Sequence, residues 1–167
     1  MLTKTEVLNS IAKEMKIVSH LATKIQAAQL PYRITPPQRS NQELLEYIAI
    51  MAEGGVAMLL SGSWEHFGVR AKAISGTALD RFPAAFAIQL QNVEQLLAPL
   101  SDAEFAAKRV KNPQGIELAL PEALFEGVVK QLVGYKMQLF LQVKAAGNPQ
   151  LATPNLWRGE DPAAKAK

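Results

Sequence analysis

The sequence contains no cysteine and only two histidines, His20 and His66. The lack of cysteine excludes a disulfide framework, a thiolate metal site, an iron–sulfur cluster and a cysteine nucleophile. Two histidines are too few for the commonest zinc sites, which draw on several imidazole or thiolate ligands. The sequence also lacks a Walker loop, a G-x-G-x-x-G motif, a nucleophile elbow and an H-E-x-x-H motif, so it carries no signature of the enzyme classes that use them.

Charge of one sign is not in large excess. Lysine and arginine number 18 against 15 acidic residues, which leaves a net charge of +3 spread along the chain. A nucleic-acid-binding protein usually clusters its basic residues on one element and interleaves aromatic residues. The densest basic stretch here is short and lies in an expected loop, at Lys108-Arg109-Val110-Lys111. We therefore expect no nucleic-acid partner.

Signals for membrane insertion or secretion are also missing. The first ten residues, MLTKTEVLNS, do not place a positively charged region before an apolar one, so they do not resemble a signal peptide. No uninterrupted apolar run reaches the ~18 residues that a membrane helix requires. We expect a cytoplasmic protein with no membrane partner.

What is present is the composition of a folded domain. The chain has 167 residues, of which 49% are hydrophobic and 20% are charged. This length suits a single domain over residues 1–167, since no repeat, low-complexity tract or linker divides it. A chain of this size buries roughly 70% of its unfolded surface and needs no disulfide to be stable.

The first helix is predicted over residues 3–29. Apolar residues recur there at steps of three and four, which places them on one stripe of a helix; they are Ile11, Met15, Val18, Ala22 and Ile25. His20 falls on another face with Lys16 and Lys24, which predicts a solvated surface histidine. Residues 30–39 contain three prolines, so we expect an extended, polyproline-like crossover rather than more helix.

The second helix is predicted to follow a capping box formed by Ser40 and Glu43. Its apolar pattern continues to Leu60 across Gly54 and Gly55, which predicts a close helix–helix contact at the glycines. Residues 61–80 contain further glycines and apolar anchors, and we expect a structured connection with a short helix.

The third helix is predicted from Arg81 to Pro99, and a brief helical turn should follow a second capping box at Ser101 and Glu104. Residues 110–118 surround a turn at Asn112-Pro113-Gln114-Gly115, which favours a small hairpin or a tight loop. The last helix is predicted from Pro121 to Ala146, closed by Gly147. The tail, 148–167, has no helical period and should pack on the domain through Trp157 or fray.

Four long helices joined by one long crossover predict an all-α four-helix bundle. Its most informative surface is on the last helix, where uncharged polar residues are spaced by four, three and four: Gln131, Tyr135, Gln138 and Gln142. A buried amide or phenol must find a hydrogen-bond partner, which can be a side chain, water or a ligand. Tyr47 on the second helix could direct its hydroxyl into the same cavity. The alternatives are a solvent-facing stripe and a core tyrosine.

Two segments, PPQRSNQELLEYIAIMA and QLVGYKMQLFLQVKAAG, resemble the DinB/YfiT-like superfamily of four-helix bundles, and a tail segment, NLWRGEDP, is also similar. Many members of this superfamily place one metal-binding histidine in the second helix and an H-x-x-x-H pair in the last helix. The resemblance implies that these positions are Tyr47, Gln131 and Tyr135 here. None of the three is histidine in this chain.

The resemblance implies a pocket, but the residues argue against the metal. Two phenols and an amide are poor ligands for zinc or nickel. Our first hypothesis is therefore a metal-free and cofactor-free module that binds an unknown small molecule at Tyr47, Gln131, Tyr135 and Gln138.

The second hypothesis is a metal-dependent transferase or hydrolase of the DinB/YfiT type. It would need ligands from His20 and His66 together with carboxylates of the second helix, namely Glu43, Glu46 or Glu53. The local sequence favours a plain surface pair at Glu65 and His66.

A third expectation concerns assembly. Exposed apolar groups at a two-fold interface would produce a homodimer. The candidates are Trp64, Phe67, Leu156 and Trp157. The alternative is that the tail covers its own bundle.

Overall fold

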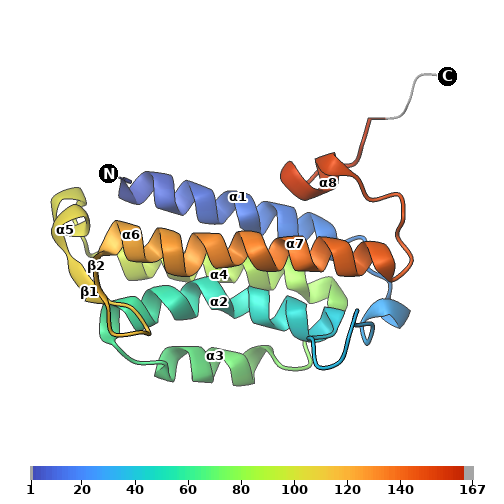
Figure 1. Ribbon diagram of the computed structural model, residues 1–167, viewed down its shortest axis with the longest axis horizontal. Helices are drawn as coiled ribbons and strands as arrows, with labels where there is room; N and C mark the ends of the chain where they lie inside the picture. Colours follow the sequence, from blue (N-terminus) through green and yellow to red (C-terminus); the bar gives the residue numbers. More distant parts are fainter. Residues whose placement is uncertain (1, 164–167) are drawn as a thin grey trace.

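Four long helical segments pack side by side in the computed structural model of the protein, which describes residues 2–163 (Figure 1). The long segments are α1 (Lys4–Ala22), α2 (Asn41–Ser61), α4 (Phe82–Leu97) and a rod made of α6 (Leu120–Leu124), a π-helical turn (Phe125–Val129) and α7 (Lys130–Ala145). The shorter elements are α3 (Glu65–Ile74), α5 (Asp102–Ala107), α8 (Thr153–Trp157), β1 (Arg109–Lys111) and β2 (Glu117–Ala119). The all-α four-helix bundle is confirmed.

The arrangement of the four long helices explains why the connection between α1 and α2 is long. α1 and α7 run in one direction, and α2 and α4 run in the other (Figure 1). α2 packs against α4 and α7, and α1 packs against the same two helices, so α1 and α2 lie diagonally across the bundle. The long crossover therefore joins helices that are not neighbours.

α1 is shorter than the apolar pattern predicts, so the expectation of one helix over 3–29 is wrong at its C-terminal end. The helix ends at Ala22, where the hydroxyl of Thr23 donates to the carbonyl of His20 at 2.7 Å. Ile25 is still buried, because the chain turns over the end of the core and forms a 3₁₀ turn at Ala27–Gln29. The apolar spacing in the sequence therefore continues to Ile25, beyond the last residue of α1.

The crossover is folded rather than extended, which corrects the polyproline expectation. A turn closes between the N–H of Gln38 and the carbonyl of Thr35 at 2.8 Å, and the N–H of Asn41 donates to the carbonyl of Tyr32 at 2.9 Å. The buried amide of Gln142 also donates to the carbonyls of Tyr32 and Arg39, at 3.3 and 3.1 Å. These bonds satisfy the amide nitrogen of the buried side chain and hold both ends of the loop against the last helix.

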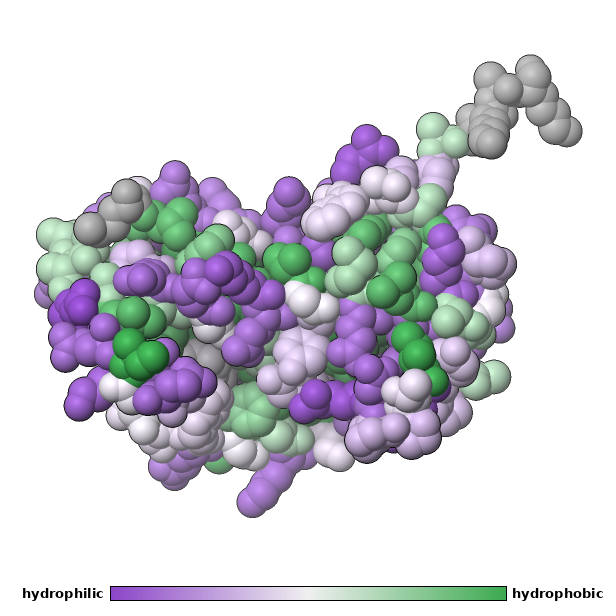
Figure 2. Space-filling view, in the orientation of Figure 1, coloured by the Kyte–Doolittle hydropathy of each residue, from purple (hydrophilic) through white to green (hydrophobic). Residues whose placement is uncertain are grey.

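α2 is a long, apolar helix, although no uninterrupted apolar run in it reaches ~18 residues. An 18-residue window of Asn41–Ser61 has a mean hydropathy of 1.5, which by length and composition is enough for a membrane span. However, 72% of that window is buried inside the bundle, as in a core helix. Figure 2 shows hydrophobic and hydrophilic residues interspersed over the face that it presents.

The two glycines of α2 bring other helices close, as predicted. A Cβ atom at Gly54 would lie 2.4 Å from Cδ2 of Phe67 in α3, and one at Gly55 would lie 3.0 Å from Cγ2 of Val128 in the π-helical turn. α3 can therefore lie directly on α2. The predicted short helix within 61–80 is confirmed as α3.

In the second half of the chain, the structure agrees with the predicted hairpin and last helix but differs in two details. The hairpin is confirmed, with Val110 paired to Leu118 in antiparallel register. The last rod runs from Leu120 to Ala145 and includes a π-helical turn that the sequence pattern did not predict. The tail contains α8, whose Leu156 is buried, so the expectation of a tail without helix is wrong. Residues 164–167 lie outside the described residues.

Candidate functional site

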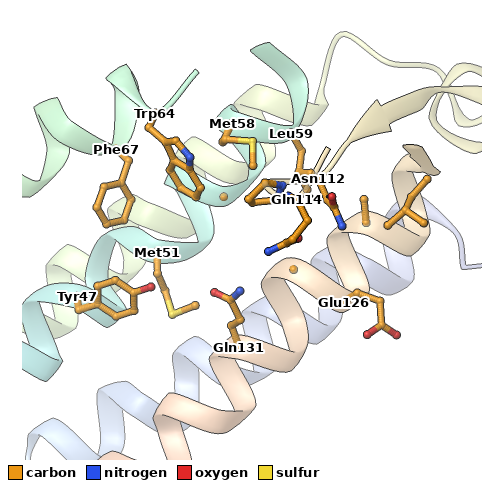
Figure 3. Close-up of a pocket in the computed structure, with 15 residues that line it drawn as sticks. Tyr47, Met51, Met58, Leu59, Trp64, Phe67, Asn112, Gln114, Glu126 and Gln131 are labelled. Carbon is orange, nitrogen blue, oxygen red and sulfur yellow. Dashed lines mark hydrogen bonds between the residues drawn. The ribbon is translucent and has the colours of Figure 1, made fainter. Parts of the chain in front are cut away.

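A pocket of about 270 Å³ lies between α2, α3, the β hairpin and the α6–α7 rod (Figure 3). Its apolar lining comes chiefly from α2 and α3, with Met51, Met58 and Leu59 from one helix and Phe67 from the other. Trp64, just ahead of α3, is 50% exposed at the pocket. The close approach of α3 at Gly54 places these aromatic side chains over α2.

Tyr47 lines this pocket, as the sequence predicts. Its hydroxyl points towards Met51 and Gln131 (Figure 3). Its ring meets that of Tyr135 edge to face, with 4.8 Å between the ring centres, and that of Phe67 at 6.1 Å. Burial, followed by the neighbouring Tyr135 phenol, raises the pKa of Tyr47 to about 12. The side chain is therefore a neutral hydroxyl at physiological pH.

Gln131 also lines the pocket, from the first turn of α7. Its amide faces that of Gln114, which comes from the turn of the hairpin (Figure 3). The turn is held by Asn112, whose Oδ1 accepts from the N–H groups of Gln114 at 3.0 Å and Ile116 at 2.9 Å. Sequence reasoning identified the hairpin but not its contribution to the pocket.

The other three residues of the polar stripe lie in different surroundings. Tyr135 contacts Tyr47 but does not line the pocket, and Gln138 is half-buried outside the lining. Gln142 is fully buried and serves the crossover loop and the Oδ1 atom of Asn41, which it reaches at 3.1 Å. The structure thus brings Tyr47, Gln131 and Tyr135 together, with Gln138 one step away. A ligand-binding role for any of them stays a prediction.

These side chains do not fit a divalent cation. Tyr47 keeps its proton, and a carboxamide oxygen is a weak ligand. The guanidinium carbon of Arg39 lies 4.0 Å from the ring centre of Tyr47 and 5.8 Å from that of Tyr135. A permanent positive charge at this place repels a metal ion. We therefore derive no chemistry through a metal.

The alternative metal ligands are also apart from one another. Among residues 2–163, no three His, Asp or Glu side chains come together as a metal site would need. His20 faces the tail segment, where its Nε2 atom lies 3.0 Å from Nδ2 of Asn155. Its side chain is only 15% exposed, so the prediction of a solvated histidine is wrong. The tail covers it, which the spacing within α1 could not reveal.

His66 does not pair with Glu65 as expected. Its Nε2 atom contacts Oε1 of Glu53, a fully buried carboxylate of α2 that Arg70 and Asn92 also contact, at 3.1 and 2.9 Å. Glu53 was named from the sequence only as one of three carboxylates of the second helix. A carboxylate within an apolar run, just before two glycines, was the available signal for a buried anchor.

A second buried ion pair was missed entirely. Nζ of Lys136 in α7 lies 2.6 Å from Oε2 of Glu14 in α1, and the ring of Trp157 covers the ammonium group at 4.5 Å. Each charge stands within the apolar stripe of its own helix. Opposite charges in two such stripes would have predicted the contact.

The sequence and the structure were compared with known proteins. No family model matches the sequence, and no curated protein is significantly similar to it. The crystal structure of a DinB-like protein, YjoA from Bacillus subtilis, superposes with a TM-score of 0.67 at 16% identity, covering 89% of this chain and 96% of that one. The chain has a DinB-like fold.

The DinB-like fold confirms the resemblance seen in the sequence. The match extends over nearly all of both chains, so the likeness in fold is not confined to one part of the bundle. It says nothing about a ligand, because a fold at this level of identity does not determine what its pocket holds.

Proposed function

We propose that this DinB-like chain is a metal-free binding module for a small, partly apolar molecule. The observation that carries the proposal is the pocket itself, which joins an apolar and aromatic lining to a few convergent polar groups. This combination is typical of small-molecule sites. Its volume of about 270 Å³ is slightly below the range of about 300–1,000 Å³ that is usual for such sites, so the ligand must be small.

The electrostatics of the pocket support binding without a metal. The hydroxyl of Tyr47 is neutral, and the guanidinium of Arg39 places a positive charge against that ring. The same arrangement disfavours a transferase or hydrolase that needs a metal at Tyr47, Gln131 and Tyr135. A module that only binds its ligand requires none of that chemistry.

Ligand screening by thermal shift tests the proposal. A compound that binds only the folded chain, present at a hundred times its Kd, stabilises it by about 2.7 kcal/mol. We expect small aromatic compounds to raise the Tm, and Tyr47→Phe and Gln131→Leu to reduce that response. Gln138→Leu is the matched control, because Gln138 lies on the same helix but outside the lining. The pocket assignment fails if both pocket variants respond like the unchanged protein.

A further inference from the structure

The pocket contains two carboxamides that face one another without a bond between them. Gln131 projects from α7 and Gln114 from the hairpin turn, and their amides approach from opposite sides in Figure 3. Neither side-chain amide forms a hydrogen bond to another residue in the described part of the chain, 2–163. A ligand placed between them can pair with both.

Within residues 2–163, the side chains that line this pocket offer no unpaired charge, and the guanidinium of Arg39 lies outside the lining, against the ring of Tyr47. Among the described residues that line the pocket, Glu126 is the single carboxylate and there is no lysine, arginine or histidine. Both oxygens of Glu126 accept from Nζ of Lys130, at 2.6 and 2.5 Å, so its charge is already balanced. A charged ligand would lose hydration in this pocket without gaining an ionic partner.

The apolar part of the lining suits a flat molecule. Trp64 and Phe67 meet edge to face, with 5.7 Å between their ring centres and 87° between their planes. Met51 and Met58 add polarisable sulfur atoms from α2, which pack well against aromatic rings. The volume corresponds to about nine water molecules at their share of about 30 Å³ each. A single ring with one polar substituent is of that size.

We propose that the ligand is a small, uncharged, planar molecule bearing a carboxamide or lactam group that bridges Gln114 and Gln131. A carboxamide offers one acceptor and up to two donors, which complement the oxygen of one glutamine and the nitrogen of the other. Its ring lies against Trp64, Phe67 and the methionines. This inference rests on the proposed function and names the class of ligand for the same pocket.

Three nearly isosteric probes test the class of ligand. Benzamide is neutral, benzoate is an anion and benzamidine is a cation, while their rings are the same. The readout is the indole N–H resonance of Trp64 in ¹⁵N-labelled protein, which Trp157→Phe distinguishes from the other tryptophan. Toluene serves as a purely apolar probe. We expect benzamide to bind at least tenfold more tightly than either charged analogue.

Variants separate the amides from the rest of the pocket. We expect Gln131→Leu and Gln114→Leu each to weaken benzamide binding at least fivefold and to leave toluene binding unchanged. Gln131→Glu should shift the preference towards benzamidine, because it adds an anion where the amide stood. Both glutamines are exposed, so these changes leave the core intact.

The outcomes distinguish the two proposals. If toluene binds but benzamide is no tighter than benzoate or benzamidine, or if both leucine variants bind benzamide normally, the inference about the ligand is wrong and the binding function stands. If no probe, toluene included, shifts the Trp64 resonance, the pocket does not bind small molecules and both proposals are wrong.

Discussion

The Nε2 atom of His66 lies 2.5 Å from Oε1 of Glu53, a carboxylate with no exposed surface. Because Glu53 belongs to α2 and His66 to α3, this contact joins the core of the bundle to the helix that forms one wall of the pocket. Arg70 adds a second contact from α3, and Asn92 adds one from α4. The carboxylate therefore fixes three helices at one point.

Removing this carboxylate should loosen α3. We expect Glu53→Gln to lower the free energy of unfolding by about 1–3 kcal/mol, because buried polar partners lose a charge-assisted hydrogen bond. Urea denaturation measures the change. Glu65→Gln, one residue before His66 and exposed, should leave stability unchanged. Equal stabilities for the two variants would mean that Glu53 does not anchor α3.

The contact at Gly54 predicts a contrast between two glycines. Gly54→Ala places a Cβ atom 2.4 Å from Phe67, so α3 must shift, and we expect a loss of about 1–3 kcal/mol. Gly134→Ala, in α7, meets nothing within 4 Å and should gain about 0.5–1 kcal/mol from helix propensity. Thermal or urea unfolding of both variants checks the prediction, which fails if Gly54→Ala is as stable as Gly134→Ala.

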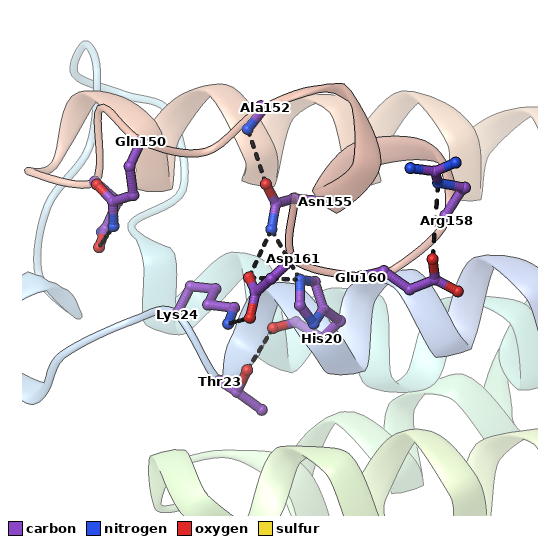
Figure 4. Close-up of polar contacts among 10 residues, drawn as sticks. His20, Thr23, Lys24, Gln150, Ala152, Asn155, Arg158, Glu160 and Asp161 are labelled. Carbon is purple, nitrogen blue, oxygen red and sulfur yellow. Dashed lines mark hydrogen bonds and ion pairs between the residues drawn. The ribbon is translucent and has the colours of Figure 1, made fainter. Parts of the chain in front are cut away.

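The contact of His20 with the tail predicts a pH dependence (Figure 4). Nε2 of His20 lies 3.0 Å from the amide nitrogen of Asn155 and 3.7 Å from Oδ1 of Asp161, so the tail contacts this ring atom directly. Burial, followed by the charge of Lys24, lowers the pKa of His20 below its ordinary 6.5. The unfolded chain therefore binds a proton more readily. Stability is complete above pH 6.5 and falls as the pH drops through 6.5 towards the lower folded-state pKa.

The measurement is the Tm at pH 7.5 and at pH 5.5, a range above that in which the capping carboxylates titrate. We expect the decrease between these values to be smaller in His20→Gln than in the unchanged protein. A decrease of the same size in both would show that His20 does not couple the tail to pH.

The side chains at Tyr47, Gln131 and Tyr135 predict that the purified protein contains little zinc or nickel. Protein purified without an affinity tag should carry well under one zinc or nickel ion per chain, since phenols and amides bind these ions weakly. Elemental analysis by mass spectrometry provides the count. A stoichiometric transition metal that disappears in Tyr47→Phe would contradict both this prediction and the proposed function.

The homodimer stays a prediction. The structure leaves fewer of the predicted interface residues exposed than the sequence indicated. Leu156 is buried in its own bundle, whereas Trp64 and Val69 of the α3 region are 50% and 62% exposed. A stable dimer buries about 800 Å² on each partner. We expect light scattering at high micromolar concentration to show a dimer that Val69→Lys disrupts. A monomer at that concentration would rule the dimer out.

The sequence was sufficient for most of the helices because local chemistry determines them. Ser40 and Ser101 form the predicted capping boxes with Glu43 and Glu104, and the turn at Asn112 closes the hairpin. These signals act over three or four residues and do not depend on the rest of the chain.

What the sequence could not give was the pairing of residues far apart along the chain. Gln114 and Gln131 belong to one pocket only because the hairpin folds back over the last helix. The burial of His20 was also misjudged, since the tail residue that contacts it comes more than a hundred positions later. Helical periodicity assigns a face to a side chain, but it does not show what will cover that face.

The direction of the helices has a consequence for how this pocket can vary. α2 and α4 run in the same direction, so the chain between them must return along the length of the bundle. α3 forms this return segment (Figure 1). The return segment is required by the topology, but its length and side chains are not required by the four-helix core. Insertions, deletions or exchanges within 62–80 therefore give this scaffold a way to acquire a new specificity while its bundle stays the same.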